Sequence, residues 1–137
     1  MRLDLYQQET AAIAGYQSAI LAEARAALSS GRALTPLEQN GVLHALQVLI
    51  ENAIGKAKHW LKAVNQPVPV SAYDAFQSLA QLGYITSEEI KEWNNAIGLR
   101  NRIVHDYMNI RMDIVLELVL AERFRFIVEF LQSPMVD

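Results

Sequence analysis

The sequence of 137 residues contains no cysteine, and this absence removes several classes of site. Without thiols the chain forms no disulfide framework, no zinc–thiolate centre and no cysteine nucleophile. Proline is also scarce, with four residues in the whole chain. Because proline breaks helices more strongly than any other residue, its scarcity leaves long stretches free to form helix.

Long apolar runs are missing as well. No stretch approaches the roughly 18 consecutive apolar residues that a membrane-spanning helix needs. Residues 1–9 lack the basic and then apolar pattern of a secretory signal peptide. We therefore expect a soluble, cytoplasmic protein with no membrane partner.

The composition is typical of a folded domain. Hydrophobic residues make up 52% of the chain and charged residues 20%, the opposite of the balance in disordered chains. The length fits one domain over residues 1–137. A net charge of −3 gives the chain as a whole no attraction for nucleic acid. Five arginines nevertheless lie between positions 100 and 125, as either a local phosphate site or a solvated face paired with carboxylates.

Two long helices are expected in the first half of the chain. Residues 3–29 are rich in helix formers and end before Gly31. Their expected apolar face comprises Leu5, Tyr6, Ile13, Tyr16, Ile20, Leu21 and Leu28. Residues 35–38, Thr-Pro-Leu-Glu, form a capping box with proline at the first helical position, and the helix runs to about Val64. Its apolar stripe is Leu43, Leu46, Leu49, Ile50, Ala53, Ile54, Ala57 and Leu61.

The second half continues the helical pattern. Two prolines within residues 65–70 forbid helix there, and a short helix is expected over residues 71–83. Thr86 begins a further helix with a second capping box. A final helix is expected over residues 112–131, stopped by Pro134. No strand pattern is present. We predict an all-α fold, an up-and-down bundle of four main helices plus one short helix.

Residues 98–107, Gly-Leu-Arg-Asn-Arg-Ile-Val-His-Asp-Tyr, are the most informative stretch. On a helix they continue a core-facing stripe of Ile90, Trp93, Ile97 and Val104. Arg100 and Tyr107 then lie on one side of the stripe. Asn101 and His105 lie on the other, four residues apart and therefore on neighbouring turns. The other histidines, His44 and His59, are fifteen residues apart on one helix, too far to share a metal.

Two interpretations of these polar residues remain open. In the first, Arg100 pairs with a carboxylate such as Glu51, His105 is a half-buried core histidine, and Tyr107 packs as an ordinary aromatic residue. In the second, the polar residues meet a second copy of the same helix across a two-fold axis. The spacing alone does not choose between them.

The motif resembles that of the HEPN superfamily, whose mark is Arg-x4-to-6-His with a polar residue after the arginine. Here it is Arg100-Asn101-x3-His105. With Tyr107 it becomes Arg-x4-His-x-Tyr, which is similar to the HepT toxins of MNT–HepT toxin–antitoxin modules. The order of helices and the proline-containing connector also suit that family. The resemblance therefore covers essentially the whole chain.

This resemblance implies a homodimeric, metal-independent ribonuclease without a cofactor, whose composite site lies in the cleft between protomers. Arg100 and His105 would be catalytic: an arginine fork can bind phosphate oxygens, and an imidazole can move protons near neutral pH. Asn101 would orient the imidazole or contact phosphate. Arg102 either assists or faces Asp106. The RNA substrate would be tRNA or mRNA.

The resemblance also implies a regulator. HepT-like proteins carry a tyrosine at the position of Tyr107 as the acceptor for AMP from a partner nucleotidyltransferase, the MNT antitoxin. An adenylate beside Arg100 and His105 would block the cleft and compete for the arginine. The competing hypotheses are a catalytically inactive helical subunit that docks a nucleotidyltransferase or a nucleotide, and a structural oligomerisation protein.

Overall fold

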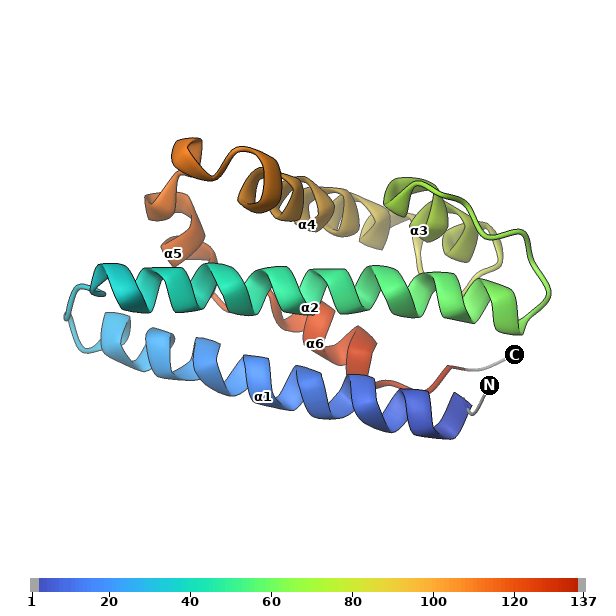
Figure 1. Ribbon diagram of the computed structural model, residues 1–137, viewed down its shortest axis with the longest axis horizontal. Helices are drawn as coiled ribbons and strands as arrows, with labels where there is room; N and C mark the ends of the chain where they lie inside the picture. Colours follow the sequence, from blue (N-terminus) through green and yellow to red (C-terminus); the bar gives the residue numbers. More distant parts are fainter. Residues whose placement is uncertain (1–2, 136–137) are drawn as a thin grey trace.

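The structure, a computed structural model, describes residues 3–135, and over that range it consists of helices joined by turns and short loops, with no strand (Figure 1). This confirms the predicted all-α class. The elements are α1 (Leu3–Ser29), α2 (Pro36–Ala63), α3 (Ala72–Gln81), α4 (Ser87–His105), the 3-10 turn η1 (Tyr107–Asn109), α5 (Met112–Leu120) and α6 (Arg125–Gln132). No helix in this described part is both long and apolar enough to span a bilayer.

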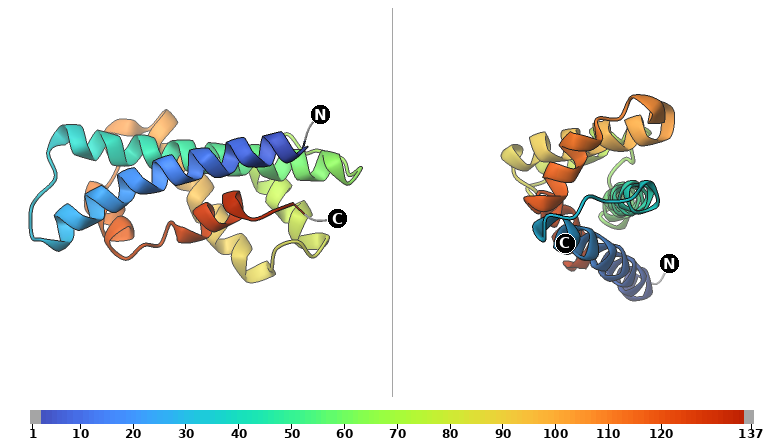
Figure 2. Two further views of the ribbon diagram at one scale, coloured as in Figure 1. Left: turned by 90° about the horizontal axis from the view of Figure 1, so that it is seen from below. Right: turned by 90° about the vertical axis from the view of Figure 1, so that its left-hand side faces the viewer.

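Helix α2 is the central element of the bundle. It packs against α1 on one side and against α3 and α4 on the other, while α6 lies against both α1 and α2 (Figures 1 and 2). Helix α4 runs antiparallel to α2, so its C-terminal end lies over the N-terminal part of α2. Helix α3 lies beside α4 as far as about Gly98, where an added Cβ would be 3.9 Å from Tyr73 Oη of α3. The far end of α4 is therefore left without a neighbour on that side.

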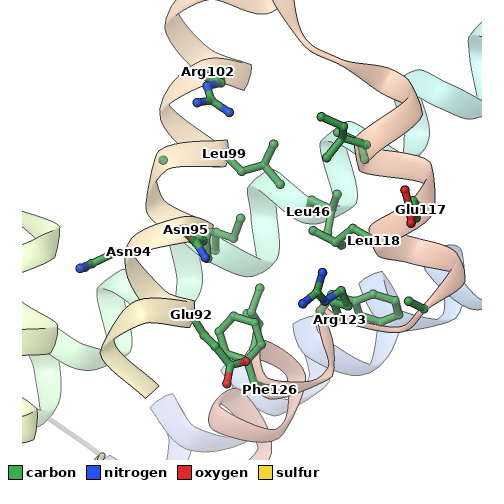
Figure 3. A pocket seen from close by; sticks show the side chains of 18 residues that line it. Leu46, Glu92, Asn94, Asn95, Leu99, Arg102, Glu117, Leu118, Arg123 and Phe126 are labelled. Carbon is green, nitrogen blue, oxygen red and sulfur yellow. The ribbon is translucent and has the colours of Figure 1, made fainter. Parts of the chain in front are cut away.

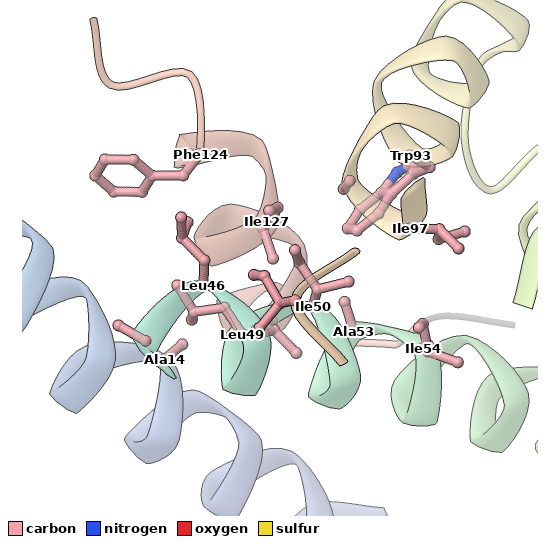
Figure 4. Packing of buried hydrophobic residues seen from close by; sticks show 14 of the residues in the cluster. Ala14, Leu46, Leu49, Ile50, Ala53, Ile54, Trp93, Ile97, Phe124 and Ile127 are labelled. Atoms are coloured by element: carbon pink, nitrogen blue, oxygen red, sulfur yellow. The ribbon is translucent and has the colours of Figure 1, made fainter. Parts of the chain in front are cut away.

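The core is built on the apolar stripe of α2, and all eight residues predicted for that stripe are buried. They face Ala14 of α1, Trp93 and Ile97 of α4, and Phe124 and Ile127 near α6 (Figure 4). Trp93 stacks on Phe76 at a centroid distance of 4.2 Å. Phe76 belongs to α3. Fully burying one such large side chain contributes about 2–3 kcal/mol, so these contacts fix α4 on both α2 and α3.

The buried face of α1 differs from the predicted one. Tyr16 is 70% exposed, whereas Ala14 and Ala24 are buried. Leu21 is fully buried, as predicted, whereas Tyr6, Ile13, Ile20 and Leu28 are half-buried and Leu5 is 49% exposed. Small side chains on the contact face let two helices approach closely, so Ala14 and Ala24 share the contact face with Leu21.

Four helices end with a left-handed residue that reverses the chain. Gly31, Asn65, Gly83 and Glu122 have φ values of 88°, 61°, 84° and 56°. After each of them, the next amide donates to a carbonyl five residues back, the hydrogen bond of the Schellman motif. The predicted ends at Gly31 and Gly83 are confirmed.

The last of these ends corrects the single helix predicted over residues 112–131. The chain forms two helices, α5 and α6, because Glu122 adopts the left-handed conformation between them. Arg25 of α1 stabilises this break: its Nε donates to Leu120 O at 2.9 Å and lies 3.3 Å from Glu122 Oε1. A tertiary contact thus ends a helix where the sequence carries neither glycine nor proline.

One lysine lies inside the core. Lys56 of α2 is fully buried, and its Nζ donates to the main-chain carbonyls of Phe130 and Ser133 at the end of α6. These are carbonyls that the end of a helix leaves unpaired. Burial lowers the pKa of Lys56 to about 8.

Candidate active site

The polar motif occupies the last two turns of α4 and the turn that follows. The predicted capping box at Thr86 starts the helix, with the Thr86 hydroxyl accepting from the Glu89 amide. The helix ends at His105 because Asp106 leaves helical geometry, at φ −143° and ψ 41°. The Asp106 amide still donates to Arg102 O at 2.8 Å, so the turn begins in a defined orientation.

Arg100 is half-buried at this end of α4. Its Nε is buried and has no hydrogen-bond partner among the described residues, and its guanidinium forms no ion pair with Glu51 or another described carboxylate. The interpretation of Arg100 as an internal ion-pair partner is therefore wrong. A buried donor without a partner is costly, which favours a partner from outside the chain.

His105 is exposed, so it is not a half-buried core histidine. Its neighbour Val104 is 43% exposed and does not belong to the core stripe, unlike Trp93 and Ile97, which are buried as predicted. Met108 is 90% exposed. Val104 and Met108 are therefore apolar side chains that the described chain leaves exposed beside His105.

Asn101 and His105 are separated by one helical turn, so their side chains lie on the same side of α4. Asn101 is half-buried. The structure thus places Arg100, Asn101 and His105 together at one end of one helix. Their individual roles remain predictions.

Tyr107 does not continue α4, as the helical projection had assumed, but begins the 3-10 turn η1. Its ring is 46% exposed, and its hydroxyl donates to Asn40 Oδ1 on α2. Asn40 is itself exposed. Nothing in the sequence pointed to Asn40, because it lies 67 residues away and belongs to no recognisable motif.

A concave region lies on another side of α4. It is a groove of about 1120 Å³ between α4, α5 and α6, with Arg102 and Glu92 at its two ends along α4 and Glu117 and Arg123 on the opposite wall (Figure 3). His105 and Arg100 do not line it. Arg102 therefore lies on the groove side of α4, unlike Arg100 and His105.

Arg102 does not pair with Asp106. Asp106 Oδ1 instead accepts a hydrogen bond from Asn109 Nδ2 at 2.7 Å. Within residues 3–135 no carboxylate lies within ion-pair distance of Arg102. Its charge is therefore available to a ligand, although from the groove side of the helix.

The remaining histidines are ordinary helix residues. His59 stacks on Tyr6 at a centroid distance of 4.1 Å, and its Nδ1 lies 3.0 Å from Gly55 O. His44 is exposed on α2. Among the described residues no three side chains of histidine, aspartate or glutamate come together as a metal-binding group.

Comparisons with known proteins agree with the motif. The model of the family described as "Ribonuclease HepT-like" matches residues 16–133. The mRNA nuclease HepT of Shewanella oneidensis is 36% identical over 81 residues, which make up 59% of this chain and 61% of that protein. The aligned part therefore spans less than two thirds of this relative.

Two solved structures share the fold, each with a TM-score of 0.77 and 24% identity. One, a toxin–antitoxin with AMP-PNP, is matched over 92% of this chain and 97% of that chain. The other is the tri-AMPylated Shewanella oneidensis HEPN toxin in complex with MNT antitoxin, matched over 93% and 96%. Since the family model matches most of the chain, this protein belongs to the ribonuclease HepT-like family.

Proposed function

We propose that this protein is the toxin of a toxin–antitoxin pair, an endoribonuclease that cleaves cellular mRNA or tRNA without a metal ion. The observation that carries the proposal is Arg100, a half-buried arginine that the described chain leaves without a partner, two turns or less from an exposed histidine. A phosphate would supply the missing acceptor in a bidentate contact. The activity of the Shewanella oneidensis relative, an mRNA nuclease, supports the same chemistry.

The proposed reaction transfers the phosphoryl group within the RNA. One His105 takes the proton from a ribose 2′-hydroxyl, and the 2′-oxygen attacks the adjacent phosphorus. The bond to the 5′-oxygen breaks, and a second His105 gives that oxygen a proton. Arg100 stabilises the charge on the phosphate oxygens in the transition state. The products are a 2′,3′-cyclic phosphate and a 5′-hydroxyl.

This chemistry uses two copies of the site. A homodimer with α4 at its two-fold axis would bring two His105 side chains to one cleft. It would also cover Val104 and Met108, apolar side chains that the single chain leaves exposed beside His105. Asn101 would orient His105, and Arg102 would add positive charge from the groove side.

The proposed antitoxin is an MNT-type nucleotidyltransferase that modifies Tyr107. The Tyr107 oxygen attacks the α-phosphorus of ATP, a new O–P bond forms, pyrophosphate leaves, and the phenolic proton passes to a base of the partner or to water. The structural relative described as tri-AMPylated and bound to MNT supports this partner. The phenol of Tyr107 is half-exposed, as an acceptor needs to be.

End-group analysis tests this function. Purified protein, shown by intact mass to carry no AMP, is incubated with defined mRNA and tRNA, and the product ends are mapped. We expect 2′,3′-cyclic phosphate and 5′-hydroxyl ends. Treatment with the nucleotidyltransferase and ATP should abolish cleavage by the wild type, and it should not change cleavage by a Tyr107→Phe variant, which has no acceptor for AMP. Absence of cleavage by AMP-free protein would instead favour a helical subunit that docks a nucleotidyltransferase or a nucleotide.

A further inference from the structure

The hydrogen bond from Tyr107 Oη to Asn40 Oδ1 joins two distant parts of the chain. Within the described residues it is the one hydrogen bond between η1 and α2. Asn40 lies in the first turns of α2, directly after the capping box of Thr35 and Glu38. Its backbone is therefore fixed by a complete capping box, so the bond ties η1 to a well-ordered part of α2.

This tie acts close to the candidate catalytic histidine. Only Asp106 separates His105 from Tyr107, and the turn itself is held by two main-chain bonds, Asn109 N to Asp106 O at 3.1 Å and Ile110 N to Tyr107 O at 3.3 Å. A turn this tight moves with the residue that begins it. Fixing the Tyr107 hydroxyl on α2 therefore restricts the last turn of α4, where His105 lies.

The same bond depends on the hydrogen of the phenol. Asn40 contributes a carbonyl oxygen, which only accepts, so Tyr107 must donate. When the Tyr107 oxygen forms a bond to the α-phosphorus of a nucleoside triphosphate, pyrophosphate leaves and the hydroxyl hydrogen is lost. The resulting ester oxygen has no hydrogen and faces another acceptor. Nucleotidyl transfer therefore abolishes this hydrogen bond as the structure has it, and the Asn40 amide would have to turn over to offer its Nδ2 as a donor instead.

We propose that Asn40 is a positioning residue of the candidate site, and that modification of Tyr107 acts partly by breaking the Asn40–Tyr107 bond. In the unmodified protein, Asn40 holds η1 and thereby His105 in the reactive arrangement. Modification adds a charged group and also releases the turn from α2. This inference rests on the proposed function for its catalytic consequence, but the contact itself can be tested separately.

The test is a double-mutant cycle on AMP-free protein, with Asn40→Ala, Tyr107→Phe and the double variant. Asn40 is exposed and alanine favours helix, so the fold is kept. We expect each single variant to lower kcat for RNA cleavage about 3- to 10-fold, the range of one lost hydrogen bond, with KM unchanged. The double variant should be no worse than either single one. Asn40→Asp keeps the acceptor and should restore cleavage, whereas Asn94→Ala, an exposed asparagine on α4, should change nothing.

Amide hydrogen exchange on the same variants reports the contact without reference to activity. We expect the Asn109 and Ile110 amides to exchange at least about 3-fold faster in Asn40→Ala than in wild type. Unchanged exchange, or additive losses of kcat in the double variant, would overturn the proposal. A wild type that cleaves no RNA would overturn the proposed function and the positioning role together. The exchange rates would then still decide whether Asn40 tethers the turn.

Discussion

Arg25, Arg32, Arg111 and Arg125 each have a carboxylate oxygen at 2.8 to 3.6 Å. Arg100, Arg102 and Arg123 have none within the described chain. Arg102 and Arg123 are exposed to water, whereas Arg100 is half-buried and its Nε is buried. A folded chain has ample carboxylates to satisfy one more arginine, so an arginine held half-buried without one is better explained by an external anion. This contrast between paired and unpaired arginines is the residue-scale basis of the proposed phosphate contact.

The contrast predicts different outcomes for two matched substitutions. Arg100→Lys should lower RNA cleavage about 10- to 100-fold, because lysine cannot replace a bidentate guanidinium. Its melting temperature should stay within about 2 °C of wild type, since no internal ion pair is lost. Arg111→Lys changes an arginine that binds Asp113 at 2.8 Å and should leave cleavage unchanged. Equal activity of the two variants would remove Arg100 from the site.

At the scale of elements, helix ends decided how far the sequence could predict the structure. Thr35 and Thr86 have side chains that cap a helix start, and Gly83 lacks the Cβ that disfavours a left-handed helix end. The structure confirms all three predicted ends. Glu122 carries no such signal. Its left-handed conformation is held by Arg25, 97 positions earlier in the chain, so no local pattern could divide α5 from α6.

The two kinds of glycine in the chain give an element-scale prediction. Gly83 ends α3 at φ 84°, a conformation that a Cβ disfavours, so Gly83→Ala should lower the free energy of unfolding by about 1 kcal/mol. Gly15 lies inside α1, where an added Cβ would meet no atom within 4 Å. Gly15→Ala should therefore raise the free energy of unfolding by about 0.5–1 kcal/mol. Urea titrations of both variants measure this, and effects of the same sign would contradict the distinction between the two glycines.

The candidate site was predictable in part for the same reason. Helical spacing predicts the placement of Arg100, Asn101 and His105 on the last turns of α4, as the structure has it. Their assignment to a site came from the resemblance to the HEPN superfamily. The position of Tyr107 in η1 depends on Asp106 leaving the helix, and its contact with Asn40 depends on how α4 crosses α2. Helical spacing contains neither fact. The contact with Asn40 depends on the packing of elements that are distant in the sequence.

For the whole molecule, the uncovered end of α4 is the surface on which the account depends. Val104→Asp should convert the proposed homodimer to a monomer and abolish cleavage, because a charge would be buried at the proposed two-fold axis. The fold should survive, since Val104 is 43% exposed in the single chain. Tyr16→Asp, on an exposed face of α1, is the matched control. Sedimentation measures the oligomeric state of both variants. If the Tyr16 variant dissociated and the Val104 variant did not, the interface would lie elsewhere.

The buried Lys56 predicts how stability depends on pH. Its pKa is about 8 when folded and 10.5 in the unfolded chain, so between these values the unfolded chain binds more protons. The free energy of unfolding contributed by this residue therefore rises with pH across that window. The free energy of unfolding of the wild type, measured relative to that of Lys56→Met, should rise by about 2 kcal/mol between pH 7 and pH 10. A difference that stays flat, or falls, would show that the buried ammonium keeps its proton.

The most direct test of the central claim is RNA cleavage in EDTA by three AMP-free proteins: wild type, His105→Ala and His59→Gln. His59 is a histidine of the same chain that stacks on Tyr6, away from α4, and serves as the control. We predict cleavage by wild type and His59→Gln, and at least about a 100-fold loss in His105→Ala. Undiminished cleavage by His105→Ala, or no cleavage by any of the three, would contradict a metal-independent ribonuclease site at the end of α4.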